Sequence, residues 1–298
     1  MIALKPLIYF SLFNHPLTDE EVFLFSETND IKEVSKDIDV LLKKGIINRV
    51  DSFLLLENNI NHIHKRIKGK KEADAIMPKA EKVAKFISKF PFIKGVAISG
   101  SLSKGYFDKK SDFDFFVITK PKRVWIARLF LAIYKRLFLN NSYKEFCVNY
   151  FVSTDTLEIE EKNKFTATEI VTIIPLFGEI EFKDFYKKNN WVHKYFPNLE
   201  LKNRADRTKS ISKPIFTKIV ELIFDNPIGT GINYLLMKYI SRRWKHRYIK
   251  KQNNPYKSKE EISKHHPDNY QQQVITRINE RYNFFETEYG INIAKEIA

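Results

Sequence analysis

The segment from Val96 to Thr119 constrains the fold more than any other part of the chain. It begins with a short β-branched run, Val96 to Ile98, which predicts a buried strand. Gly100-Ser101 follows and predicts a tight turn, where backbone N–H groups can approach a phosphate with no Cβ in the way. A second strand is expected to carry Asp112 and Asp114. The segment therefore predicts two successive strands with an anion-binding turn between them.

Asp112 and Asp114 are expected to point the same way. Residues i and i+2 of a strand share a face, so both carboxylates lie on one side while Phe113, Phe115 and Val117 face a core. Two like charges held this close repel strongly unless a cation lies between them. Mg²⁺, or Mn²⁺ in its place, fits because Mg²⁺ favours carboxylates together with substrate phosphates. We therefore predict a metal–phosphate site at Asp112 and Asp114.

The order of these features resembles the signature of the nucleotidyltransferase superfamily, as found in DNA polymerase β-like domains. That signature is a hydrophobic strand, Gly-Ser, a loop, and Asp-hydrophobic-Asp on the next strand, and Gly100-Ser101 and Asp112 to Asp114 match it. The resemblance implies an α/β (α+β) nucleotidyltransferase core with a mixed sheet. It also implies transfer of a nucleoside monophosphate from an NTP to an acceptor. The resemblance further implies that Gly100 and Ser101 position the phosphates, and Lys104 is the nearest cation that could offset the charge on pyrophosphate.

The family usually carries a third acid on a later strand, and this chain departs from that pattern. The best-matching register places Asn149 at that position. An asparagine carbonyl can coordinate a metal, but it brings no charge and cannot take a proton. Glu145 and Asp155 are the nearest acids that could substitute, and neither matches the motif.

Two classes of function therefore stay open. The first is a Mg-dependent nucleotidyltransferase whose acceptor is a small molecule, a protein or an RNA end. The second is a catalytically weak or inactive nucleotide-binding regulatory protein that contacts nucleic acid or a protein partner. Asp112 and Asp114 favour the enzyme, and Asn149 favours the regulatory protein.

The chain of 298 residues is expected to contain three domains. Residues 1–70 predict three helices and a hairpin, which resembles a winged helix, with a capping box from Thr18 to Glu21. Such a domain binds nucleic acid or serves as a packing module, and the mixed charges of its third helix are poor for contacting phosphates. Residues 71–160 are expected to form the catalytic core after a linker at Gly69 to Lys71. Residues 161–298 predict a mainly helical region.

A basic segment near the end of the chain, Ser241 to Lys251, has six Lys or Arg residues and no acid. Trp244 and Tyr248 are interleaved with these cations, so the segment could bind RNA or DNA by phosphate contacts and stacking. A solvated helix end is the alternative. The candidate nucleic-acid contacts are four of these cations: Arg242, Arg243, Arg247 and Lys250. The net charge of +15 likewise favours a polyanionic partner.

The single cysteine, Cys147, excludes a disulfide framework and a zinc-finger site, and its apolar surroundings predict a core residue. The N-terminal residues match neither a signal peptide nor a membrane span, so we expect a cytoplasmic protein with no membrane-spanning helix.

Overall fold

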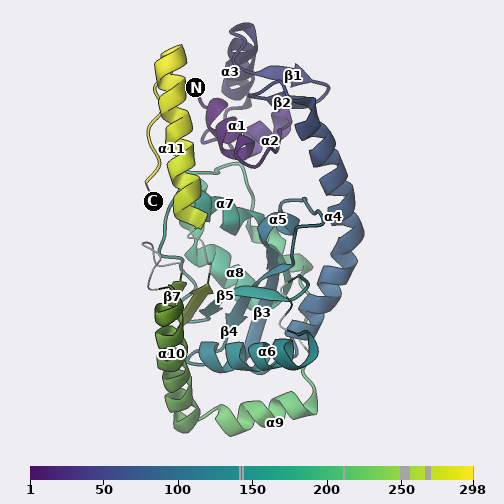
Figure 1. The fold of residues 1–298 in the computed structure, drawn as a ribbon, viewed down its shortest axis with the longest axis vertical. Coiled ribbons are helices and arrows are strands. Elements are labelled where there is room, and N and C mark those ends of the chain that lie inside the picture. Colours follow the sequence, from purple (N-terminus) through teal and green to yellow (C-terminus); the bar gives the residue numbers. More distant parts are fainter. Residues whose placement is uncertain (141, 143, 211, 249–255, 266–269, 298) are drawn as a thin grey trace.

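A six-stranded sheet lies at the centre of the structure, a computed structural model that describes all residues except 141, 143, 211, 249–255, 266–269 and 298 (Figure 1). The strand order is β6-β3-β4-β5-β8-β7. The strands are β3 (Ile93–Ser99), β4 (Asp114–Thr119), β5 (Cys147–Ser153), β6 (Ile174–Phe177), β7 (Tyr256–Lys259) and β8 (Ile262–His265). Strands β4 and β5 are parallel, whereas the other neighbours are antiparallel. The predicted mixed sheet is confirmed.

Alternation along β3 and β4 builds a core on each side of the sheet. Ile98 and Phe115 face one side, where they pack with α4 (Ile60–Ile87) and α6 (Val124–Phe138). Ala97 and Phe116 face the other side, where α7 (Lys164–Thr172) and α8 (Glu179–Lys188) cover them. Because successive side chains of a strand point to opposite faces, this burial on both sides requires the continuous apolar runs seen in the sequence.

The prediction of a linker at Gly69 to Lys71 is wrong, because these residues lie inside the continuous helix α4. Gly69 is buried, and a Cβ at this position would overlap the ring of Tyr106. Its carbonyl also accepts a hydrogen bond from the Phe107 N–H at 3.1 Å. The glycine therefore permits close packing against the loop that follows β3, rather than a break in the chain.

The N-terminal elements occur in the expected order. They are α1 (Leu4–Ser11), α2 (Asp19–Leu24), α3 (Ile31–Lys43), β1 (Asn48–Val50) and β2 (Phe53–Leu55). The capping box of α2 is present, with Thr18 and Glu21 each accepting a backbone N–H of the other. These elements share a hydrophobic core with α11 (Tyr270–Tyr289), which lies beside them in Figure 1. The relation of this segment to winged helices stays a prediction.

The C-terminal region is helical but also supplies three strands of the sheet. Its other elements are the 3₁₀ turns η1 (Asn190–Lys194) and η2 (Lys202–Arg207) and the helices α9 (Ile215–Phe224) and α10 (Pro227–Tyr248). The apolar run that ends at Phe177 divides into α7 and the edge strand β6. Pro175 is tolerated in β6 because an edge strand can lack one ladder donor. Strands β7 and β8 are short and mostly polar, so neither segment has the apolar alternation that predicts a strand.

Candidate nucleotide and metal site

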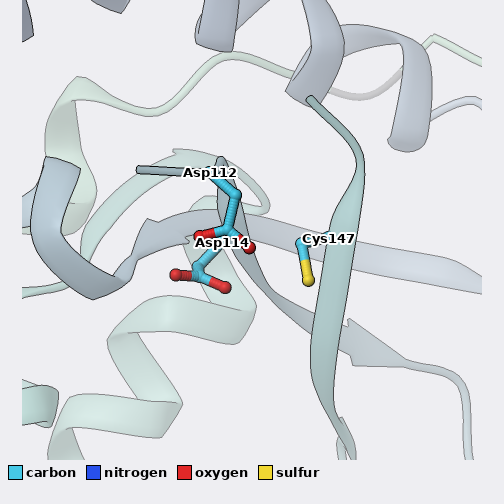
Figure 2. Close-up of side chains that lie close together, drawn as sticks. All are labelled: Asp112, Asp114 and Cys147. Atoms are coloured by element: carbon cyan, nitrogen blue, oxygen red, sulfur yellow. The ribbon is translucent and has the colours of Figure 1, made fainter. Parts of the chain in front are cut away.

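The two predicted acids lie together beside Cys147 (Figure 2). Asp114 is the first residue of β4 and pairs with Cys147, the first residue of β5, whereas Asp112 lies just before β4. One ligand atom from each of the three side chains lies within 4.8 Å of the others. The carboxylates therefore converge as predicted, although only Asp114 belongs to the strand.

Gly100 brings the turn after β3 close to Asp114. Ser99 pairs with Asp114 in the sheet, and the helical turn α5 (Gly100–Ser103) follows directly. Gly100 has a φ of +67°, and a Cβ at this position would overlap Oδ2 of Asp114. The position therefore needs glycine for two reasons, its left-handed backbone and the adjacent carboxylate.

Lys104 connects this turn to a carboxylate that the sequence analysis did not identify. Its Nζ donates to the Gly100 carbonyl at 3.1 Å and lies 2.9 Å from Oε1 of Glu169 on α7. Glu169 is partly buried and lines the same cavity as Asp112 and Asp114. In the sequence, Glu169 stands out only as a single acid within a mostly apolar run, and it belongs to no motif.

Asp114 is electrostatically strained. Burial, followed by the charges of Asp112 and Glu169, raises the pKa of Asp114 to about 7, although Lys104 opposes the shift. Asn149 supplies a compensating contact, because its Nδ2 donates to Oδ1 of Asp114 at 2.8 Å. A bound cation would relieve the same repulsion.

Cys147 is poorly suited to bind a hard cation. Burial and the charges of Asp114 and Asp112 raise the pKa of its thiol to about 12. The protonated Sγ lies 3.2 Å from Oδ1 of Asn149 and donates to it. Since the thiolate is the ligand form and Mg²⁺ prefers oxygen, Asp112 and Asp114 are the better ligands at this site.

Neither substitute considered for the third acid reaches the site. Glu145 lies before β5 and pairs with Lys79 of α4. Asp155 lies past the other end of β5 and accepts a hydrogen bond from Ser153. Only Asn149 of these three side chains lines the cavity described below.

A cavity of about 970 Å³ opens over the two acids. Gly100, Ser101, Lys104 and Asn149 lie in its wall together with Asp112 and Asp114. Much of the remaining wall comes from α1 and the residues after it, from α7, and from the start of α11. Its aromatic members include Phe10, Phe13, Phe165 and Tyr270. Both ends of the chain thus contribute to the cavity over the predicted site.

The structure revises the prediction for the basic segment. Arg242 and Arg243 are exposed on α10. Trp244 is buried with its ring centroid 5.8 Å from that of Trp125, so it cannot serve as an exposed platform for stacking bases. The Arg247 side chain and Lys250 lie outside the described parts of the structure. Nucleic-acid binding by these cations stays a prediction.

Comparison with known families identifies the central part of the chain. A family model described as nucleotidyltransferase domain matches residues 79–200, a range that includes β3, β4, β5 and both acids. The chain therefore carries a domain of the nucleotidyltransferase superfamily. Comparisons with curated proteins and with solved structures gave no match. Within the described residues, no helix has the length and apolar character needed to cross a membrane.

The raised pKa of Asp114 predicts a pH-dependent gain in stability for Asp114→Asn. A carboxyl with a pKa of about 7 when folded and about 4 when unfolded binds an extra proton in the native state between those values. The wild type therefore loses stability as pH rises through this window. We expect the variant to be more stable at pH 8, by up to about 4 kcal/mol, with the advantage shrinking toward pH 4.

Urea unfolding without divalent cations, followed by tryptophan fluorescence, measures this difference. Glu145→Gln is the matched control, because it removes an exposed carboxylate outside the cavity. An advantage of Asp114→Asn that is equal at every pH would contradict the electrostatic explanation.

Proposed function

We propose that this protein is a Mg²⁺-dependent nucleotidyltransferase that moves a nucleoside monophosphate from an NTP to an acceptor and releases pyrophosphate. The main observation is the convergence of Asp112 and Asp114 beside the Gly100 turn, inside a nucleotidyltransferase domain. The donor set fits Mg²⁺, because this ion prefers oxygen ligands and would relieve the repulsion between the two carboxylates. The adjacent sulfur is a protonated thiol and does not compete as a ligand. When bound, Mg²⁺ would neutralise charge on the triphosphate.

The residues around the acids have distinct roles in this proposal. Gly100 and Ser101 position the terminal phosphates, since both line the cavity beside Asp114. Lys104 pairs with Glu169 at 2.9 Å, and a triphosphate would compete with Glu169 for the same ammonium group. Asn149 orients the Asp114 carboxylate through its amide rather than acting as an acid.

Glu169 is our candidate for the missing third carboxylate. It lines the cavity, and its charge contributes to the raised pKa of Asp114. If the triphosphate draws Lys104 away, Glu169 loses its cation and can accept a proton from the acceptor. Glu161 also lines the cavity, but its charge acts on Tyr150 instead. Glu169 is therefore the better candidate for the general base.

The cavity favours a small-molecule acceptor over a protein or an RNA end. Segments from both ends of the chain surround the site, and aromatic rings contribute to its wall. The rings of Phe13 and Phe165 both lie near the ring of Tyr270, with centroid distances of 6.5 and 6.0 Å to it. A concave site with apolar walls and a few polar groups is typical of small-ligand recognition.

One observation favours the alternative, a nucleotide-binding regulatory protein with weak or no turnover. Asn149 donates to Asp114 from the strand position where the family usually has an acid. That arrangement supports nucleotide binding without a third negative ligand. The two functions differ in pyrophosphate release and share nucleotide binding.

The double variant Asp112→Ala, Asp114→Ala should lose Mg²⁺-dependent nucleotide binding while staying folded. The physical reason is that it removes both oxygen ligands and relieves a repulsive pair. Isothermal titration with Mg-ATP, GTP, CTP and UTP measures the affinity, and Glu145→Gln is the control. Equal binding by the wild type and the double variant would show that the site is placed wrongly.

Glu169→Gln should lower pyrophosphate release by about 10²–10⁴-fold with little change in nucleotide affinity, since general-base help is typically of that size. The assay follows pyrophosphate from each NTP with Mg²⁺ or Mn²⁺ and a lysate that supplies acceptors. Glu145→Gln should match the wild type. If the wild type is inactive and Asn149→Asp gains turnover, the regulatory alternative is the correct one. An active wild type with an equally active Glu169→Gln variant would exclude this role of Glu169.

A further inference from the structure

Helix α9 turns two polar side chains inward and most of its large apolar side chains outward, although Val220 and Phe224 pack inward. Thr217 is buried and its Oγ1 donates to the Lys89 carbonyl at 2.9 Å. Glu221 accepts from the Phe92 N–H at 2.6 Å and from Lys213. On the opposite side, five large apolar side chains are 50–79% exposed: Ile215, Phe216, Ile219, Leu222 and Ile223. A helix that packs its whole apolar stripe on a core would not leave these five side chains exposed.

Helix α10, which follows α9, also carries exposed apolar side chains. Ile228, Leu235 and Tyr239 are exposed and lie on one side of the helix, because they are separated by seven and four residues. Figure 1 shows α9 and α10 meeting at the end of the molecule farthest from the N-terminal helices. We call the five α9 residues and these three α10 residues the α9–α10 apolar face.

The two helices are held firmly in this orientation. At the corner, a Cβ on Gly229 would overlap the Phe224 carbonyl, and the Gly229 N–H donates to Asn226 Oδ1 at 3.0 Å. Farther along α10, the buried Asn233 accepts from the Trp125 N–H at 2.9 Å. The inward side of each helix is thus already packed and hydrogen-bonded. Simple rotation to bury the apolar face would break these contacts.

The charges around this face are mainly positive. Lys218, Lys238, Arg242 and Arg243 are exposed on the two helices. Glu221 is the only acid in the sequences of α9 and α10, and it pairs inward with Lys213. Asp225, between the helices, pairs with Lys120. The outward surface therefore combines aliphatic side chains with cations that no acid of either helix neutralises on that side.

We propose that the α9–α10 apolar face docks on an anionic lipid bilayer. The aliphatic side chains would enter the boundary between headgroups and acyl chains, while the lysines and arginines would meet lipid phosphates. A second copy of the chain fits less well, because pairing two such faces would bring like charges together. Nucleic acid also fits less well, because the face presents aliphatic side chains and the buried Trp244 cannot stack on a base.

Vesicle flotation tests this docking with the full-length protein. Wild type should float with vesicles of phosphatidylcholine and phosphatidylglycerol, less with phosphatidylcholine alone, and less at high salt. The double variant Ile219→Glu, Leu222→Glu should bind at least about tenfold more weakly, since it replaces two inserting side chains with acids. Ile180→Glu on α8 is the matched control, because Ile180 is 73% exposed outside this face, and it should float like the wild type.

Arg242→Glu with Arg243→Glu tests the electrostatic part without touching the apolar residues. This variant should lose affinity for anionic vesicles and lose much of the salt dependence. Circular dichroism melting curves check that each variant is folded. If the Ile219→Glu, Leu222→Glu variant is unfolded, the arginine variant alone tests the proposal.

Three results would overturn the proposal. The first is wild type that does not float with anionic vesicles. The second is a lipid-free dimer, seen by sedimentation velocity, that the α9 variant dissociates. The third is RNA binding that the arginine variant abolishes, with vesicle binding that the same variant leaves unchanged.

Discussion

The close approach of the Gly100 turn to the Asp114 carboxylate is the constraint on which the site depends. It exists because β3 and β4 pair so that Ser99 lies opposite Asp114. The turn that follows β3 must then fit against Oδ2, and only glycine leaves the space. Burial beside Asp112 raises the pKa of Asp114, so the arrangement is costly without a cation. Apolar packing on both sides of the sheet offsets that cost.

A buried charge joins segments near both ends of the chain to the nucleotidyltransferase domain. Lys164 at the start of α7 is 1% exposed and lies 3.1 Å from Glu27 and 3.7 Å from Glu296. Removing either partner would leave the lysine undercompensated in the interior, which is strongly destabilising. Helix α7 also places Glu169 in the cavity wall, and it contacts the N-terminal segment through Phe165. The cavity wall is thus coupled to the assembly of both termini.

This arrangement suggests a role for the N-terminal segment besides nucleic-acid binding. Phe10, Phe13 and His15 line the cavity, and burial together with Arg66 lowers the pKa of His15 to about 4. His15 is therefore neutral at ordinary pH and contributes an uncharged ring to the cavity wall. The elements predicted from residues 1–70 act, in our proposal, as the acceptor-side wall of the enzyme. The packing of these elements against α11 fixes the position of that wall.

Local sequence determined the elements, the Gly100 turn and the two acids, because β-branched runs, capping residues and glycine act over a few residues. The family's motif also selected Asn149, which lines the cavity with the two acids. Tertiary structure alone decided which distant groups joined them. Glu169 reaches the cavity because α7 packs across the sheet, whereas Glu145 is held away by Lys79. Trp244 is buried because α10 is anchored on α6 through Asn233, a contact that spacing could not reveal. Periodicity and turn chemistry are local, but the pairing of segments far apart depends on how all buried surfaces fit together at once.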